Sequence, residues 1–291
     1  MSVPFWISLL HYAVSITGTV ESTFLIGIIL MKTPARMRSY SVLLLSLTGS
    51  QLITCLSSCI LFARLIPVGT SLIAAINGPI AYIINSDQFC YYLWFFMLHG
   101  HGHFIVMLTV CFLYRYYIMF KPTPQLLTAV VIVLGAYTPT VLLLGTSALA
   151  PISSQEFIRE LFSKNRPSYE FDQDQLFFGI ENVLQFLIGF LWITTSTFPC
   201  YTIILIAGRK IYTTLGANQI HMSESTKSNH REIIKGLVIQ SFLPSFYCFS
   251  IYSYALGQFE ILNTPMLEYS THMFGELTVA MAPFMTLFFV K

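Results

Sequence analysis

The chain has 291 residues, of which 55% are apolar and only 10% are charged, and its mean hydropathy is +0.69. These values exclude an ordinary soluble domain, because such domains carry a much larger share of charged residues. The formal net charge of +2 favours neither a nucleic acid nor an acidic ligand as a partner. The positions of the charges along the chain are therefore more informative than their sum.

Seven apolar segments, each long enough to cross a hydrocarbon layer as a helix, follow one another along the chain. At about 1.5 Å per residue, about 20 helical residues cross a layer of about 30 Å. The sequence therefore predicts an all-α membrane protein in which residues 1–291 form a single seven-transmembrane helix bundle. The predicted helices cover residues 6–31, 40–63, 89–114, 126–148, 182–207, 233–256 and 269–290.

Positive charges are concentrated in alternate connections between these segments. The connections after the first, third and fifth segments hold nine cations: Lys32, Arg36, Arg38, Arg115, Lys121, Arg209, Lys210, Lys227 and Arg231. Those after the second, fourth and sixth hold four: Arg64, Arg159, Lys164 and Arg166. Because short basic loops stay in the cytoplasm, the pattern predicts an N-terminus outside the cell and a cytoplasmic C-terminus.

The longest connection, residues 151–181, is polar and acid-rich and is predicted to lie outside. A long outer loop can cover the mouth of a pocket. A solvated spacer is the alternative interpretation. Further acidic residues predicted on the same side are Asp87, Glu260 and Glu268.

The third segment is the best marked. Residues 89–114 contain no Lys, Arg, Asp or Glu, and a cation with aromatic neighbours follows at once in Tyr114-Arg115-Tyr116-Tyr117. Aromatic and cationic side chains gather where lipid meets water. Arg115 is therefore predicted at the inner end of the third helix.

Polar side chains inside apolar segments need a partner or a purpose. His99 and His103 are four residues apart and share one face of the third helix, whereas His101 points elsewhere. Counted from the outer ends, His99 lies at a depth similar to that of Glu276, and His103 at a depth similar to that of Glu21. We therefore expect His99 to pair with Glu276, and expect His99, His103 and Glu276 to line an outward ligand pocket. A hydrogen-bonded network that only holds helices together is the alternative.

Little in the sequence indicates an enzyme. It has no Gly-x-Ser-x-Gly elbow and no phosphate-binding glycine loop. The histidine pair has no further ligands at metal-binding spacing, so no metal and no cofactor are expected. Prolines interrupt four segments, and Pro199, Pro244 and Pro283, with Pro139, are predicted helix pivots compatible with a switch.

Seven helices, an outer N-terminus and an arginine at the inner end of the third helix together resemble G-protein-coupled receptors. Local stretches narrow the resemblance to the nematode serpentine receptors of class delta (Srd), and it covers nearly the whole chain. These stretches are residues 32–41, 64–71, 97–99, 114–117 and 222–228, the last leading to Gln240 and Pro244. The resemblance implies a chemoreceptor in the plasma membrane of chemosensory neurons, with a small-molecule ligand and a heterotrimeric G protein as partners.

Two departures from well-known receptor motifs stand out. Tyr114 occupies the position of the acid that precedes the arginine in rhodopsin-like receptors, so an ionic restraint between neighbours cannot form. The last segment reads Met281-Ala282-Pro283-Phe284-Met285, without an Asn-Pro-x-x-Tyr motif. The sequence therefore departs from the best-known receptor switch.

The sequence thus predicts a receptor whose ligand binds among the third, fifth, sixth and seventh helices. The predicted G-protein-facing residues are Tyr114, Arg115, Tyr116, Arg209, Lys210, Lys227, Arg231 and Lys235. Alternatively, these cations only set the topology and contact anionic lipid. A small transporter or channel subunit remains a second reading, which requires a continuous polar path, and a structural membrane protein is a third.

Overall fold

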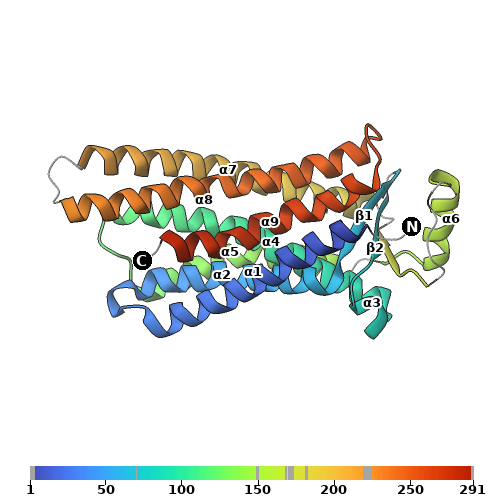
Figure 1. Ribbon diagram of the computed structural model, residues 1–291, viewed down its shortest axis with the longest axis horizontal. Helices are drawn as coiled ribbons and strands as arrows, with labels where there is room; N and C mark the ends of the chain where they lie inside the picture. Colours follow the sequence, from blue (N-terminus) through green and yellow to red (C-terminus); the bar gives the residue numbers. More distant parts are fainter. Residues whose placement is uncertain are drawn as a thin grey trace.

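The computed structural model describes residues 4–69, 71–148, 151–167, 169, 174–180, 183–218 and 224–289. Helix dominates this part of the chain, and the long helices lie side by side along the longest axis of the molecule (Figure 1). They are α1 (Phe5–Lys32), α2 (Arg38–Leu61), α4 (Asp87–Ile118), α5 (Leu126–Ala148), α7 (Val183–Asn218), α8 (Glu224–Gln258) and α9 (Pro265–Phe289). Each coincides with a segment that the sequence predicts to be helical.

The helix ends differ from the predicted ones where polar residues continue a helix. α7 runs to Asn218 and α8 begins at Glu224, well beyond the apolar parts at 182–207 and 233–256. α2 ends earlier than predicted, because Phe62 adopts the left-handed conformation (φ 39°) and the chain then enters a strand. Among the described residues, the helices α1, α2, α4 and α5 are long and apolar enough to cross a membrane.

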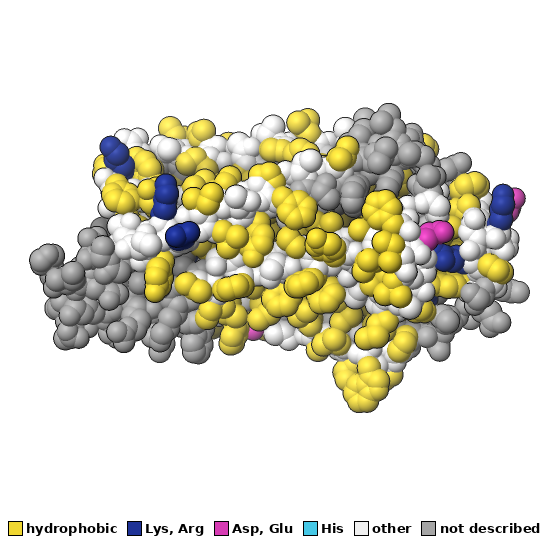
Figure 2. Space-filling view, turned by 90° about the horizontal axis from the view of Figure 1, so that it is seen from above, with side chains coloured by type: hydrophobic (Ala, Val, Ile, Leu, Met, Phe, Trp, Pro, Cys, Tyr) yellow, Lys and Arg dark blue, Asp and Glu magenta, His cyan; other side chains and the backbone are white. Residues whose placement is uncertain are grey.

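The connections between helices alternate between two ends of the bundle. One end, here called the sheet end, carries a small β-sheet and the short helices α3 (Ile80–Ile83) and α6 (Gln155–Asn165) (Figure 1). The other, here called the basic end, carries the connections from α1 to α2, which include the 3₁₀ turn Ala35–Met37, and from α4 to α5. In Figure 2, hydrophobic side chains dominate the middle of the visible face and Lys and Arg side chains lie towards its two ends.

The sheet at the sheet end corrects the all-α prediction. It consists of the antiparallel strands β1 (Ala63–Val68), β2 (Ser71–Ile76) and β3 (Phe177–Ile180), in the order β1-β2-β3. β1 and β2 form a hairpin in which Val68 pairs with Ser71, and Gly69 supplies the positive φ (58°) of the turn. Every residue of the three strands is buried. Such strands lack the alternation of polar and apolar residues that reveals a half-exposed strand, so the sequence pattern did not indicate them.

The two faces of the sheet are covered by different layers. Leu65, Ala74 and Phe178 lie in one cluster with Tyr91 and Trp94 of α4. The opposite face, with Ile66, Ile73 and Phe177, packs against Ile158 and Phe162 of α6. The connection of residues 151–181 therefore contributes a strand and a covering helix, and its interpretation as a solvated spacer is wrong for the described residues.

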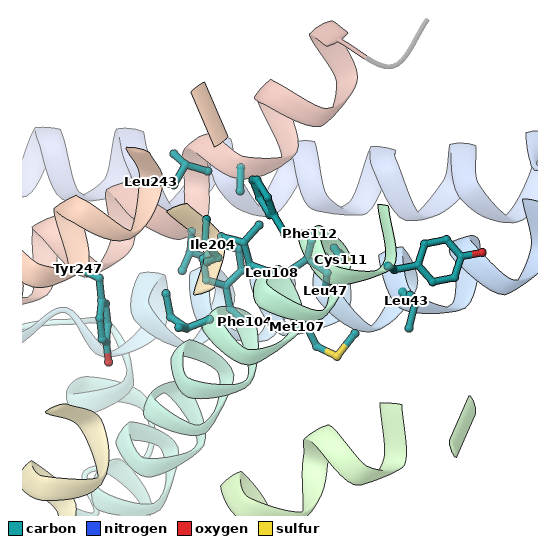
Figure 3. Close-up of a cluster of buried hydrophobic side chains, with 14 of the residues drawn as sticks. Leu43, Leu47, Phe104, Met107, Leu108, Cys111, Phe112, Ile204, Leu243 and Tyr247 are labelled. Atoms are coloured by element: carbon teal, nitrogen blue, oxygen red, sulfur yellow. The ribbon is translucent and has the colours of Figure 1, made fainter. Parts of the chain in front are cut away.

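The main core surrounds α4. In the most apolar part of α4, 67% of the residues are buried, against 11% in that of α5. α4 is therefore central and α5 peripheral. Figure 3 shows the core cluster, in which side chains of α4 meet those of α2, α7 and α8. Its members include Leu43 and Leu47 of α2, Phe104, Met107 and Phe112 of α4, Ile204 of α7 and Leu243 of α8.

A close approach between three helices gives a first prediction. A Cβ atom on Gly18 of α1 would lie 2.7 Å from Cys55 Sγ of α2 and 2.9 Å from Ala280 Cβ of α9. Small residues allow such close contacts between membrane helices. We expect Gly18→Val to lower the free energy of unfolding by about 1–3 kcal/mol through overpacking, measured by thermal unfolding in detergent. Gly27→Val, in the same helix, is the control, since a Cβ there meets only Met31 Cε at 4.0 Å. Equal losses for both variants would contradict the packing explanation.

Candidate functional site

Arg115 lies in the last turn of α4 and joins several helices at the basic end. Its Nε donates a hydrogen bond to the Tyr40 hydroxyl of α2 (2.7 Å), and its Nη1 donates one to Gln240 Oε1 of α8 (3.1 Å). Gln240 Nε2 in turn donates to Thr286 Oγ1 of α9 (3.2 Å). We call Arg115, Tyr40, Gln240 and Thr286 the arginine network. It connects four helices, and no acidic side chain among the described residues is part of it.

The arginine network explains how this chain restrains Arg115 when Tyr114 replaces the usual acid. The Tyr114 ring stacks on the Tyr40 ring at 5.3 Å between centroids, so Tyr114 positions the residue that accepts from Arg115. Hydrogen bonds to a charged group contribute about 1.5–3 kcal/mol each. A set of two such bonds to two helices can therefore favour one arrangement of the basic end over another.

The other residues predicted to face a G protein are partly placed. Lys210 of α7 lies over the Tyr116 ring of α4, with Nζ 5.6 Å from the ring centroid. Arg209 is exposed on α7. The side chains of Lys227, Arg231 and Lys235 lie outside the described part of the structure. Arg115, Tyr116 and Lys210 thus lie together where α4 ends beside α7.

The predicted pairing of His99 with Glu276 is wrong. Glu276 of α9 contacts His11 of α1 instead, with Nδ1 3.0 Å from Oε2, and the Ser58 hydroxyl of α2 donates to Oε1 of the same carboxyl. His11 and Glu276 are both almost completely buried. His99 and Glu276 lie at similar depths, but α4 turns His99 towards α2 and α5 and α9 turns Glu276 towards α1. Depth in the membrane does not specify which neighbouring helix a side chain faces.

His11 is fully engaged, because its Nε2 lies 3.2 Å from the Ser58 carbonyl oxygen. A carbonyl can only accept, so Nε2 carries a hydrogen and Nδ1 faces the carboxyl group.

His99 and His103 share one face of α4, as predicted, and this face is turned towards α2 and α5. The His103 ring stacks on Tyr137 of α5 at 3.6 Å, and its Nε2 lies 2.8 Å from Ser46 Oγ of α2. The neighbour of His103 Nε2 is thus Ser46 and not Glu21, the residue that the sequence places at a similar depth. His99 stacks at 6.3 Å from His103, one turn nearer the sheet end.

His99 borders a small cavity where α4, α5, α7 and α8 meet. The free space is about 10 Å³, room for about one water molecule. Its lining includes His99 of α4, Thr140 of α5, Trp192 and Ser196 of α7 and Tyr247 of α8. His103 and Glu276 do not line it. Of the three predicted pocket residues, only His99 lines this cavity. Its described lining includes α5, the fourth predicted segment, and no residue of α9, the seventh.

A buried ion pair joins the sheet end to the bundle. Arg64 Nε and Nη2 of β1 each lie 2.6 Å from Glu268 Oε2 of α9, and both side chains are only 3% exposed. The Tyr169 hydroxyl donates to Glu268 Oε1 (2.7 Å), and the Arg64 guanidinium lies over the rings of Tyr169 and Tyr269, 5.1 and 5.4 Å from their centroids. Burial and the adjacent Glu268 raise the pKa of Tyr169 to about 12, so the hydroxyl remains a donor at neutral pH. Sequence reasoning treated Arg64 and Glu268 only as loop charges.

Sequence reasoning assigned no partner to three histidines whose side chains contact other helices of the bundle. His11 pairs with Glu276, His101 stacks on Tyr247 at 5.7 Å, and His272 accepts a hydrogen bond from Trp94 Nε1 (3.2 Å). A histidine within an apolar segment indicates a buried partner, but this indication is the same for every such histidine and does not identify the partner. Among the described residues, no three His, Cys, Asp or Glu side chains are placed to hold a metal ion.

The predicted pivots Pro139, Pro199, Pro244 and Pro283 lie inside α5, α7, α8 and α9. Each removes one backbone hydrogen bond from its helix. Pro244 lies four residues after Gln240, so it is placed where a bend would move the arginine network. A role as a pivot remains a prediction.

Comparison with known proteins gives a consistent result over nearly the full length. A family model described as "Serpentine type 7TM GPCR chemoreceptor Srd" matches residues 7–291. The chain is 28% identical over 291 residues to Serpentine receptor class delta-3 of Caenorhabditis elegans, covering 97% of this chain and 84% of that protein. It is 29% identical over 288 residues to Serpentine receptor class delta-18 of the same organism, with the same coverage.

Proposed function

Because this chain belongs to the Srd family of serpentine-type 7TM GPCR chemoreceptors, a family of multi-pass membrane proteins, we propose that it is a chemosensory receptor for a small ligand that acts through a heterotrimeric G protein. The ligand reaches it from outside, the sheet end faces outwards, and the basic end faces the cytoplasm. The cation asymmetry of the loops supports this orientation. The proposed location is the plasma membrane of chemosensory neurons.

The arginine network is the observation that best supports signalling. A receptor transmits a signal only if its ligand prefers one of two packings that differ at the far end. Arg115 contacts α2 and α8, and Gln240 extends the connection to α9, so a movement of α8 changes the surroundings of Arg115. Arg115, Tyr116, Arg209 and Lys210 then form the described part of the surface offered to the G protein.

This function is tested by nucleotide exchange on purified receptor in lipid nanodiscs with G protein and an odorant panel. We expect at least one odorant to stimulate exchange and Arg115→Ala to reduce the stimulated rate by roughly tenfold or more, which corresponds to about 1.4 kcal/mol. Arg38→Ala is the control, because it removes an exposed cation at the same end. Odorant-dependent ion or solute flux in proteoliposomes without nucleotide exchange would instead support the transporter alternative.

A further inference from the structure

A groove lies between α7 and α8 towards the basic end of the bundle. It holds about 270 Å³ of free space, slightly less than the roughly 300–1,000 Å³ of typical ligand pockets. Its described lining consists of four residues of α7 and two of α8: Leu205, Gly208, Arg209, Tyr212, Val238 and Ser241. None of these residues belongs to the arginine network, so the groove is a separate feature of the basic end.

The groove faces away from the interior of the bundle. Val238 comes two residues before Gln240, whose side chain points inwards to Arg115. Two residues correspond to about 200° of rotation around a helix axis, so Val238 points outwards. Arg209 stands in the same relation to Ile211, which is buried in the main core. Val238 and Arg209 are both exposed, so in a membrane the groove is open to lipid.

The groove lies at the depth of lipid headgroups. Residues 183–208 contain no Lys, Arg, Asp or Glu, and Arg209 is the first charged residue after this stretch. In α8, the last cation before the apolar part is Lys235, three residues before Val238. Both helices therefore pass from polar surroundings into hydrocarbon beside the groove. Leu205, about one turn deeper than Arg209, lies at the level of the acyl chains.

The polar groups of the groove suit a phosphate. The planar guanidinium of Arg209 matches two phosphate oxygens, and the Tyr212 hydroxyl, three residues further along the same face, can donate to a third. Among the described residues, neither side chain has an ion pair or a hydrogen-bond partner. The described lining contains no carboxylate that would compete for Arg209 or bind the ammonium of a choline headgroup. An anionic headgroup therefore fits the groove better than a zwitterionic one.

We propose that the groove between α7 and α8 binds one anionic phospholipid, with its phosphate on Arg209 and Tyr212 and an acyl chain along Leu205 and Val238. In the orientation proposed above, this lipid comes from the cytoplasmic leaflet. The inference goes beyond the proposed function, because lipid binding requires neither an odorant nor a G protein. Of the cations proposed to face the G protein, Arg209 is then the one that contacts lipid.

Native mass spectrometry of the purified full-length chain tests this site. The protein in detergent is mixed with equal amounts of dioleoyl phosphatidylglycerol and dioleoyl phosphatidylcholine, which share acyl chains and a phosphate but differ in net charge. We expect the first retained lipid to be phosphatidylglycerol about tenfold more often than phosphatidylcholine, because only the anionic lipid leaves no unpaired cation in the groove. Equal retention of the two lipids would overturn the proposal.

Arg209→Gln removes the guanidinium charge, so we expect the preference for phosphatidylglycerol to fall to about twofold or less. Tyr212→Phe keeps the ring and removes only the hydroxyl, so an intermediate preference is expected. Arg38→Gln is the matched control, because it removes an exposed cation from the same end that does not line the groove. A preference that survives Arg209→Gln would refute the role of Arg209. Equal losses in Arg209→Gln and Arg38→Gln would show a general attraction of anionic lipid to the basic end and refute the specific site.

A second variant tests the groove itself and leaves Arg209 in place. Val238→Trp fills the space between the helices, and we expect it to abolish the preference for phosphatidylglycerol. Ile206→Trp is its control, because Ile206 is exposed on α7 and does not line the groove. An unchanged preference in Val238→Trp would refute the groove as the binding site. Displacement of the bound lipid by an excess of inorganic phosphate would show a site for free anions and refute the assignment to lipid.

The lipid measurement is independent of the receptor function, since it contains neither an odorant nor a G protein. Retention of phosphatidylglycerol that depends on Arg209, without odorant-stimulated nucleotide exchange, would refute the proposed function alone. Odorant-stimulated exchange by a protein that shows no preference between the two lipids would refute this inference alone.

Discussion

Gln240→Leu is expected to raise basal nucleotide exchange about tenfold in the absence of any odorant. The substitution removes the acceptor that holds Arg115 Nη1 and the donor that reaches Thr286. A hydrogen bond to a charged group contributes about 1.5–3 kcal/mol. If about 1.4 kcal/mol of this is specific to the packing described here, its loss shifts the equilibrium towards the alternative packing about tenfold.

The measurement is basal exchange per receptor at matched amounts in nanodiscs. Tyr40→Phe removes the other partner of Arg115 and should act in the same direction. Ser241→Leu places a leucine in the same turn of α8 as a control, because the Ser241 hydroxyl only donates to the Val238 carbonyl of its own helix. Unchanged basal exchange in both Gln240→Leu and Tyr40→Phe would show that the arginine network does not restrain the receptor.

Arg64→Met is expected to have the largest effect on stability, lowering the free energy of unfolding by about 3–5 kcal/mol. Removing one partner of a buried ion pair leaves the other charge buried and unpaired. Here Glu268 would keep the Tyr169 hydroxyl as a partner but lose both nitrogen contacts with Arg64. The sheet should then separate from α9 before the helices unfold.

Unfolding in detergent and hydrogen exchange of β1 and β2 measure this effect. In Arg64→Met/Glu268→Leu both charges are absent, so we expect this double variant to recover much of the loss. Arg166→Met is the control, because the Arg166–Glu260 pair at the same end is 4.0 Å apart and Glu260 is 68% exposed. Such exposed pairs contribute about 0–1 kcal/mol. Similar losses for Arg64→Met and Arg166→Met would contradict the account of the ion pair.

The position of each long helix followed from the sequence, because the length and hydrophobicity of a segment are local properties. The same holds for the location of Arg115, whose aromatic neighbours mark a helix end. The predicted helices at 182–207 and 233–256 are shorter than α7 and α8, because polar residues continue both helices beyond their apolar parts. Family membership agrees with these local features.

The partners of the buried polar groups were decided only by the tertiary structure. Residue counting gives the depth of His99, Glu276 and His11, but a contact also depends on which way each helix face is turned and which helix lies beside it. Glu276 therefore meets His11, and His99 is left beside a cavity with a free nitrogen among the described residues. The sheet depended on the same information, because its strands are buried on both faces, against α4 and α6, and lack the polar–apolar alternation that would have indicated them. Hydrophobicity along the chain determined where the helices are, and their packing decided what their polar side chains can bind.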